Sequence, residues 1–255
     1  PLLGTIILGS IAVASSSNKK GAPEGIVGAI AVLLPAMSFV SVAALATNMP
    51  VSGIRETLCN WIDIPLLKVD IGFLFDALSR IMLLFVTGIG TLIALYSIGY
   101  MHGDRGFARF FAYINLFLFS MIVLVLSDSL LLTFLGWEGV GLCSYLLIGF
   151  WNKDIKNCKA ANKAFIVNRV GDIGFLLGML CLVTVGGAGA LNYDLLNQFI
   201  QMVIAGGHVE LVLPMLTLAS VMFFVGCTGK SAQIPLLTWL PDAMAGPTPV
   251  SALIH

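Results

Sequence analysis

A series of long apolar stretches, separated by short polar segments, constrains this chain more than any other feature. The hydrocarbon core of a bilayer is about 30 Å thick, so a helix needs roughly 20 apolar residues to cross it. Seven stretches reach or approach that length, and an eighth begins near Pro247. The seven cover residues 1–16, 25–47, 72–100, 107–126, 130–151, 161–185 and 211–240. The sequence therefore predicts an all-α polytopic membrane protein.

The composition agrees with this class and excludes several others. Hydrophobic residues make up 58% of the 255 residues and charged residues only 10%, whereas soluble domains have about 25% charged residues. The net charge is zero, so nothing indicates a nucleic-acid partner. The five cysteines show no C-x-x-C spacing, and neither a Gly-rich phosphate loop nor an HExxH pattern occurs. We expect no metal and no cofactor in this chain.

Both ends of the chain look cut. Pro1 opens directly into an apolar stretch, and His255 follows shortly after the expected start of the eighth helix. We expect a part of a longer protein or one piece of a split protein, and we find no cleavable targeting segment.

The basic residues between the apolar stretches predict the orientation. Eight of them lie in the first, third and fifth connections or within the first three residues of the stretch that follows, whereas the second, fourth and sixth connections hold only Arg55 and Lys68. Basic residues gather on the cytoplasmic side of a membrane. We therefore expect the odd-numbered connections to face the cytoplasm or matrix, and the N-terminus to face the intermembrane or periplasmic side.

Two connections are long enough to hold structure of their own. Residues 48–71 contain Trp61, Pro65 and several β-branched residues, which favour a short hairpin at the outer surface. Residues 193–203 form a weakly amphipathic run, which is typical of a helix at the membrane interface. We assign no chemistry to either segment.

The last complete apolar stretch contains a helix breaker. Pro235 has no N–H, so the carbonyl of Ser231 loses its helical partner. Irregular backbone at membrane depth persists only inside protein or beside water. We therefore expect a broken seventh helix that lines a hydrated interior, as in many transporters.

Several charged residues fall within the apolar stretches, where a central charge costs about 2.5–3.5 kcal/mol. Glu138 lies near the middle of its stretch, with Gly136, Gly139 and Gly141 around it. The glycines allow another helix or water to approach closely. Glu138 is either a structural carboxylate paired across helices or a proton-relay site, and we favour the second because intramembrane charge usually marks function.

Lys230 lies near the middle of the broken helix, among small residues that leave room for water. Lysine can release a proton when it is desolvated and hold one when a carboxylate approaches, whereas arginine stays protonated. We favour a proton carrier that faces Glu138 over a purely structural ion pair.

Other charges are weaker candidates. Arg169 and Asp172 share one helix face and either form an internal salt bridge or tune the Glu138–Lys230 pair. Asp76 and Arg80 are explained by pairing with each other or by snorkelling. Two further candidates are Asp128, expected to be solvated at a helix junction, and His255, a terminal histidine able to relay protons.

Three runs resemble antiporter-like subunit 5, or L, of respiratory complex I (NADH:quinone oxidoreductase). They are FLGWEGVGLCSYLLIGFW (134–151), KAFIVNRVGDIGFLLG (163–178) and GKSAQIPLLTWLPDAMAGPTPVSALIH (229–255). Residues 109–128 also resemble the fourth helix of that subunit. The resemblance covers nearly the whole chain and corresponds to the N-terminal half of the family's subunits.

The resemblance implies a set of functional residues and a fold. Members have two inverted five-helix repeats and a lateral C-terminal helix, of which this chain has the first repeat and lacks the second. The family's glutamate, lysine and histidine match Glu138, Lys230 and His255, and its sixth-helix pair matches Arg169 and Asp172. Residues 1–105 would hold helices 1–3 with the outer loop 48–71. Residues 106–255 would hold the proton-translocation core, helices 4–7 and the start of helix 8.

The implied function is proton translocation coupled to electron transfer from NADH to quinone, with no redox centre in this chain. Partners would be the other membrane-arm and redox subunits, lipids, and a chain or segment that completes the subunit. The membrane would be a mitochondrial inner membrane or a bacterial plasma membrane. Two alternatives stay open: the large subunit of a multi-subunit Na⁺/H⁺ antiporter, and a piece that only braces or assembles the membrane arm.

Overall fold

The computed structural model describes residues 1–15, 22–48, 50, 53–64, 67–207 and 209–254. Helices dominate, as the apolar stretches predict. The α-helices of the described residues are α1 (Leu2–Ser15), α2 (Glu24–Thr47), α3 (Ala77–Tyr100), α4 (Phe107–Leu126), α5 (Leu130–Ile148), α6 (Ile155–Gly186), α7 (Tyr193–Ala205), α8 (Val209–Lys230) and α9 (Thr248–Ile254). Three 3₁₀ turns, η1 (Ala188–Leu191), η2 (Leu237–Trp239) and η3 (Asp242–Ala245), follow α6 and α8.

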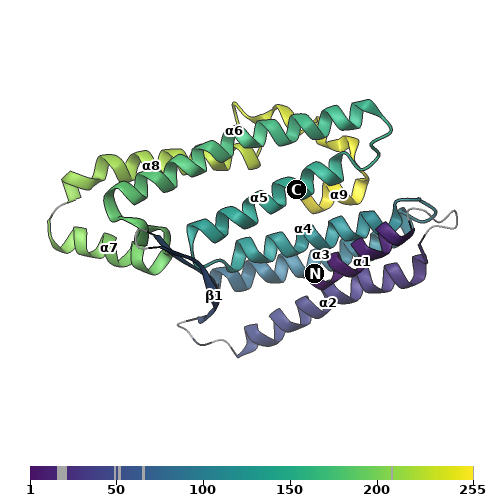
Figure 1. Ribbon diagram of the computed structural model, residues 1–255, viewed down its shortest axis with the longest axis horizontal. Helices are drawn as coiled ribbons and strands as arrows, with labels where there is room; N and C mark the ends of the chain where they lie inside the picture. The colour runs from purple at the N-terminus through teal and green to yellow at the C-terminus, as the bar shows by residue number, and fades with distance from the viewer. Residues whose placement is uncertain (16–21, 49, 51–52, 65–66, 208, 255) are drawn as a thin grey trace.

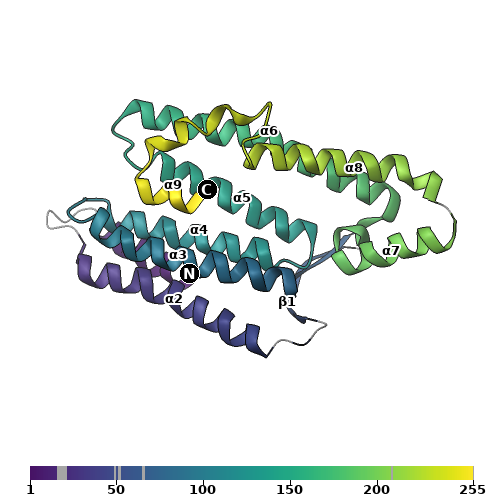
Figure 2. The same cartoon turned by 180° about the vertical axis from the view of Figure 1, so that it is seen from behind.

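The helices lie side by side as an elongated bundle (Figures 1 and 2). α6 and α8 pack antiparallel along one side, α5 lies between them and α4, and α1, α2 and α3 complete the other side. T-shaped contacts among Phe110, Phe111 and Phe150 fill the core around α4. α5 therefore contacts α6 on one side and α4 on the other.

Within the described residues, six helices, α2 to α6 and α8, are long and apolar enough to cross a membrane. The sequence predicts seven spans, and the difference is α1, which has 14 residues and is apolar but short. The run at residues 193–203 is a helix, α7, that has no buried residue. The protein is an integral membrane protein by the length and composition of these helices.

The connection between α2 and α3 forms an antiparallel hairpin of β1 (Ile54–Ile64) and β2 (Leu67–Phe75). It is longer than the sequence suggests, so α3 begins at Ala77 rather than near Gly72. The reason is Asp76, which caps α3: its carboxylate accepts the Ser79 N–H at 2.8 Å, and the Ser79 hydroxyl accepts the Asp76 N–H. Asp76 and Arg80 form no ion pair in the structure, so the expected pairing of the two is wrong, and the alternative, snorkelling, stays a prediction.

The hairpin lies at one end of the bundle, beside α7 and the α4–α5 junction (Figure 1). We call this the hairpin end. The opposite end holds the α3–α4 and α5–α6 connections, with the basic residues Arg105 and Lys153 in them and Lys156 in the first turn of α6. We call it the basic end.

α8 stops at Lys230, earlier than the position of Pro235 suggests. A Schellman motif satisfies two of its last backbone carbonyls. The Gln233 N–H donates to the Thr228 carbonyl at 3.0 Å, and the Ala232 N–H donates to the Gly229 carbonyl at 3.3 Å. Ala232 has φ +48°, a left-handed conformation that usually belongs to glycine. The predicted broken helix is present, and Lys230 is the last residue before the break rather than an interior one.

Candidate functional site

The charged residues singled out from the sequence gather halfway along the bundle. Glu138 is near the centre of α5, and Gly171 is near the centre of α6. The α-carbon of Gly229, next to Lys230, lies 3.1 Å from the position that a β-carbon would take on Gly171. Glycines at this crossing let the backbones of α6 and α8 touch. The break in α8 therefore falls at mid-depth, beside α5 and α6.

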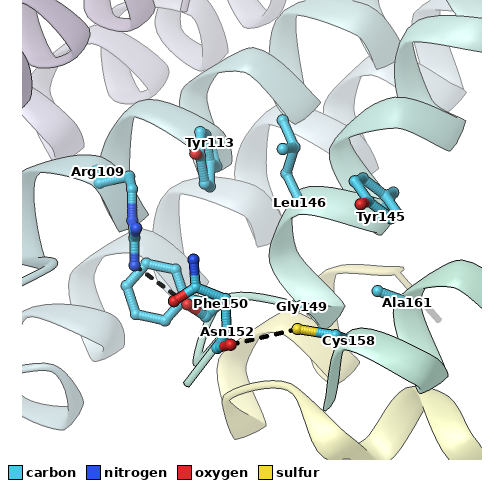
Figure 3. Close-up of a pocket in the computed structure, with 9 residues that line it drawn as sticks. All are labelled: Arg109, Tyr113, Tyr145, Leu146, Gly149, Phe150, Asn152, Cys158 and Ala161. Carbon is cyan, nitrogen blue, oxygen red and sulfur yellow. Dashed lines mark hydrogen bonds between the residues drawn. The ribbon is translucent and has the colours of Figure 1, made fainter. Parts of the chain in front are cut away.

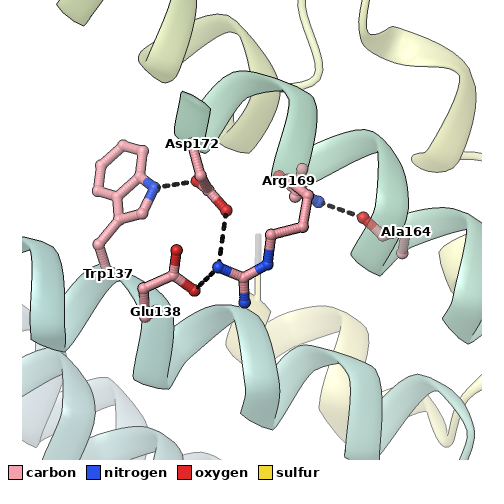
Figure 4. Close-up of polar contacts among 6 residues, drawn as sticks. Trp137, Glu138, Ala164, Arg169 and Asp172 are labelled. Atoms are coloured by element: carbon pink, nitrogen blue, oxygen red, sulfur yellow. Dashed lines mark hydrogen bonds and ion pairs between the residues drawn. The ribbon is translucent and has the colours of Figure 1, made fainter. Parts of the chain in front are cut away.

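Arg169 connects the two acidic residues of the site (Figure 4). Its guanidinium forms an ion pair with Glu138 across the α5–α6 interface and a looser one with Asp172, at 3.8 Å on its own helix. Asp172 is buried, with 3% of its surface exposed. The helix-face argument predicts the Arg169–Asp172 pair, and the structure adds that Arg169 also holds Glu138.

Glu138 is only partly satisfied by this arrangement. One carboxylate oxygen pairs with Arg169, whereas Oε1 is buried without a hydrogen-bond partner in the part of the chain that the structure describes. A buried acceptor without a partner costs about 1–3 kcal/mol. The Glu138 carboxyl therefore has one oxygen in an ion pair and a second oxygen that can bind a proton or a water molecule.

Lys230 does not pair with Glu138 as expected. Among the described residues its ammonium has no carboxylate within 4.0 Å, and Nζ lies 5.6 Å from the centre of the Trp137 ring. Asp172 and Glu138 are the acidic residues whose charges act on it. In place of a direct Glu138–Lys230 pair, Arg169 pairs with one oxygen of Glu138, and the side chain of Lys230 lies against Gly141. A β-carbon there would be 2.6 Å from Nζ.

Two tryptophans belong to the site and were not found by sequence reasoning. Trp137 donates its indole N–H to Asp172 at 2.6 Å and lies against Lys230. Trp239, from η2, is buried and donates to the Gly229 carbonyl at 3.0 Å, which fixes the end of α8. The sequence feature that could have identified them is the indole N–H, because a tryptophan inside an apolar segment needs a hydrogen-bond acceptor for that group.

The remaining candidates lie elsewhere. His255 is outside the described residues, and so are Lys19 and Lys20 of the first connection. Asp128 lies at the hairpin end, where it is 4% exposed rather than solvated. The reason is that the hairpin covers it: Asp128 packs against Gly72, where a β-carbon would lie 2.5 Å from its Cγ. Burial raises the pKa of this carboxyl, although the charge of Arg55 opposes the effect.

These observations define a class: an integral membrane bundle with a helix broken at mid-depth and a network of buried charges beside the break. The chain belongs to the family described as NADH:quinone oxidoreductase/Mrp antiporter, whose profile matches residues 127–255. A second profile, for the N-terminus of chain 5 of NADH-ubiquinone oxidoreductase (complex I), matches residues 61–111.

Curated relatives match along the whole chain. NADH-quinone oxidoreductase subunit L of Escherichia coli (strain K12) is 45% identical over 255 residues, which is all of this chain and 40% of the relative. NADH-ubiquinone oxidoreductase chain 5 of Metridium senile is 43% identical over all of this chain and 40% of its own length. The chain thus spans about two fifths of the length of these relatives.

Solved structures share the fold. The Mrp complex from Dietzia sp. DQ12-45-1b contains a chain that superposes with a TM-score of 0.77 at 26% identity, over all of this chain and 26% of that one. A chain of the membrane-bound sulfane sulfur reductase, an archaeal respiratory membrane complex, superposes with a TM-score of 0.75 at 15% identity, over 99% of this chain and 48% of that one. The second likeness concerns the fold alone.

Proposed function

We propose that the chain acts as the proton-translocating part of a membrane-arm subunit of NADH:quinone oxidoreductase, and that it carries protons through Glu138 and Lys230. The observation that supports this most directly is the unequal pairing at mid-depth. Glu138 is held by Arg169 through one oxygen, while its second oxygen has no hydrogen-bond partner and the Lys230 ammonium has no carboxylate within 4.0 Å among the described residues.

Such an arrangement can exist in two states. Arg169 stays protonated under all relevant conditions, so it can change partner but cannot carry the proton. When Arg169 turns toward Asp172, Glu138 is free to attract the Lys230 ammonium, which favours the protonated lysine. When Arg169 returns to Glu138, the lysine loses that attraction in a site of low dielectric and releases its proton more readily.

Arg169 has freedom to make this exchange. Its side chain is 41% exposed, and Asp172 already lies 3.8 Å away. Asp172 in turn is held by the Trp137 indole, which also lies against Lys230. One tryptophan thus touches both the acceptor for Arg169 and the proposed proton carrier, so a change of partner can be transmitted to Lys230. Arg169 and Asp172 are positioning residues in this proposal, and His255 would receive the proton farther along the chain.

A Na⁺/H⁺ antiporter subunit is the second candidate, because the fold of the Mrp complex is shared along the whole chain. Sequence identity favours the first proposal, since it is 45% to subunit L of the oxidoreductase and 26% to the Mrp chain. Partners under the first proposal are the other oxidoreductase subunits, lipids and the part of the subunit that completes the second repeat. We propose that the basic end faces the cytoplasm or matrix and the N-terminus the opposite side.

The test is proton pumping by the assembled complex carrying Lys230→Ala in the full-length subunit. In proteoliposomes supplied with NADH and quinone, we expect proton uptake per NADH to fall about tenfold, because the carrier is removed. Lys163→Ala is the matched control. Lys163 pairs with Asp242 at 2.7 Å at an exposed position, and exposed pairs contribute little, so its pumping should stay near that of the wild type.

Gly141→Ala tests the position of the amine without removing it. The added β-carbon would meet Nζ of Lys230, so pumping should fall while assembly persists. Gly99→Ala, in α3 where a β-carbon meets nothing within 4 Å, should have no effect. Normal pumping by an assembled Lys230→Ala complex would reject the role of Lys230. Na⁺-driven proton movement without NADH would assign the chain to the antiporter branch instead.

A further inference from the structure

A cavity of about 180 Å³ lies at the basic end, away from the network of Glu138 and Lys230 (Figure 3). Its walls come from the first turns of α4, the last turn of α5 with the residues that follow, and the first turns of α6. No acidic residue lines it, and one cationic side chain does, that of Arg109.

The polar groups of the cavity are mainly donors without a partner. The Arg109 guanidinium uses one of its N–H groups in a bond to the Phe150 carbonyl, at 3.1 Å, and stacks on the Phe150 ring at 4.7 Å. The hydroxyls of Tyr113 and Tyr145 and the amide of Asn152 have no hydrogen-bond partner among the described residues. A guanidinium fork with hydroxyl donors around it is the arrangement that binds a phosphate group.

The guanidinium is fixed in place before any ligand binds. The bond to Phe150 and the stacking on its ring hold one edge of the fork, so the remaining N–H groups lose little freedom when they bind an anion. A role in capping the end of α5 accounts for one donor of Arg109. It does not account for the cavity or for the other donors that line it.

The charges around the cavity favour an anion. Lys153, Lys156 and Lys159 flank the lining residues Asn152 and Cys158 in the sequence, and we call them the rim lysines. They are exposed and form no ion pair within the described part of the chain. The two nearby carboxylates are engaged locally. Asp104 accepts the Gly106 N–H and the Trp151 indole N–H, and Asp154 accepts the Lys156 N–H at the start of α6.

The apolar surroundings identify the source of the anion. Leu146 lines the cavity, and Leu142 and Leu135 continue along the same side of α5 with 46% and 48% of their surfaces exposed. Trp151, which follows the lining residue Phe150 and is exposed, is of a type common at the membrane interface. A phosphate bound at Arg109 would therefore be followed, toward the membrane interior, by a surface suited to an acyl chain.

We propose that this cavity binds the phosphate group of an anionic phospholipid from the leaflet at the basic end. Arg109 and the tyrosine hydroxyls bind the phosphate, the rim lysines attract the headgroup, and α5 carries an acyl chain. Basic pockets between transmembrane helices bind anionic headgroups in this way.

Cys158 provides the readout, because it lines the cavity and is partly exposed. The assembled complex with the full-length subunit is placed in nanodiscs of phosphatidylcholine alone or of phosphatidylcholine with phosphatidylglycerol. The rate of Cys158 alkylation by N-ethylmaleimide is followed by mass spectrometry. We expect the anionic lipid to slow the reaction roughly fivefold and Arg109→Gln to abolish the protection. Arg105→Gln removes an exposed charge of the α3–α4 connection, four residues before Arg109, that does not line the cavity, and it should leave the protection intact.

The other outcomes overturn the proposal. Equal rates in both nanodiscs would show that no anionic lipid occupies the cavity. Slow alkylation even in phosphatidylcholine would show that protein covers it. Full protection by inorganic phosphate in phosphatidylcholine would assign the site to a free anion. Where Arg109→Gln does not assemble, Tyr113→Phe removes one donor without changing the charge and should weaken the protection.

Discussion

At the scale of single residues, the environment of each buried charge decides its chemistry. Asp128 and Asp172 are both almost fully buried. Asp172 has an indole donor and a guanidinium nearby, whereas Oδ1 of Asp128 has no hydrogen-bond partner among the described residues. Two aspartates of similar burial therefore differ in their partners: Asp172 is bound by an indole N–H and lies near a guanidinium, whereas Asp128 packs beneath the hairpin that covers it.

Asp128→Asn should make the full-length subunit more stable at neutral pH, by on the order of 1 kcal/mol. Burial raises the Asp128 pKa, so the folded protein favours the neutral carboxyl, and wild-type stability falls as the pH rises through the raised pKa. Asparagine does not titrate. The gain should therefore be largest at neutral pH and disappear below about pH 4, the ordinary pKa of aspartate. Thermal unfolding measured across this pH range checks both statements.

Asp63→Asn is the control for this prediction, since Asp63 is on the same hairpin but exposed, 3.4 Å from Lys68. Its effect should be small at every pH. A loss of stability in Asp128→Asn that is the same at all pH values would mean that the shape of the carboxyl, and not its charge, matters at this position.

At the scale of elements, the crossing of α6 and α8 positions the site. Gly171, Gly226 and Gly229 bring the two backbones into contact, and the Schellman motif ends α8 directly after Lys230. The Lys230 amine therefore lies at the C-terminal end of α8. A side chain at the crossing would separate the helices and move the amine with them.

Gly171→Ala tests this crossing. Its β-carbon would lie 3.1 Å from the Gly229 α-carbon and 3.2 Å from the Gly226 carbonyl oxygen, both backbone atoms that cannot turn away. We expect a loss of about 1–3 kcal/mol in stability, together with reduced pumping. Thermal unfolding and NADH-driven proton uptake are the measurements. Gly9→Ala, in α1 with nothing within 4 Å, should change neither, and a stable, fully active Gly171→Ala protein would contradict the role of the crossing.

At the scale of the whole molecule, the two ends of the bundle differ in kind. The hairpin end is closed by strands, by α7 and by the ion pair between Arg55 and Asp194. The basic end has short connections, with Lys153, Lys156 and Lys159 at and after the α5–α6 connection, and holds the cavity of Arg109. This asymmetry agrees with a fixed orientation in the membrane.

The orientation predicts the labelling of two native cysteines. Cys59, exposed on β1, and Cys158, at the start of α6, are separated by three spanning helices, α3 to α5. They should therefore lie on opposite sides. A membrane-impermeant maleimide should label Cys59 in vesicles with the outer face exposed and Cys158 in inverted vesicles. Labelling of both cysteines in one kind of vesicle would contradict the proposed topology.

The sequence alone determined the class of protein, because the length and hydropathy of a spanning helix are local properties that a bilayer imposes. It also identified Glu138, Arg169, Asp172 and Lys230 as a group, since charge within an apolar stretch is visible without a structure. The break after Lys230 was foreseeable from Pro235 for the same local reason.

Only the tertiary structure decided which charges meet. Arg169 holds Glu138, Lys230 lies against Trp137 and Gly141, and Asp128 is buried beneath the hairpin. The physical reason is that pairing depends on how closely distant segments approach. That approach is set by glycines on α6 and α8 and by strands that replace the expected first turns of α3, and no single stretch of sequence contains it.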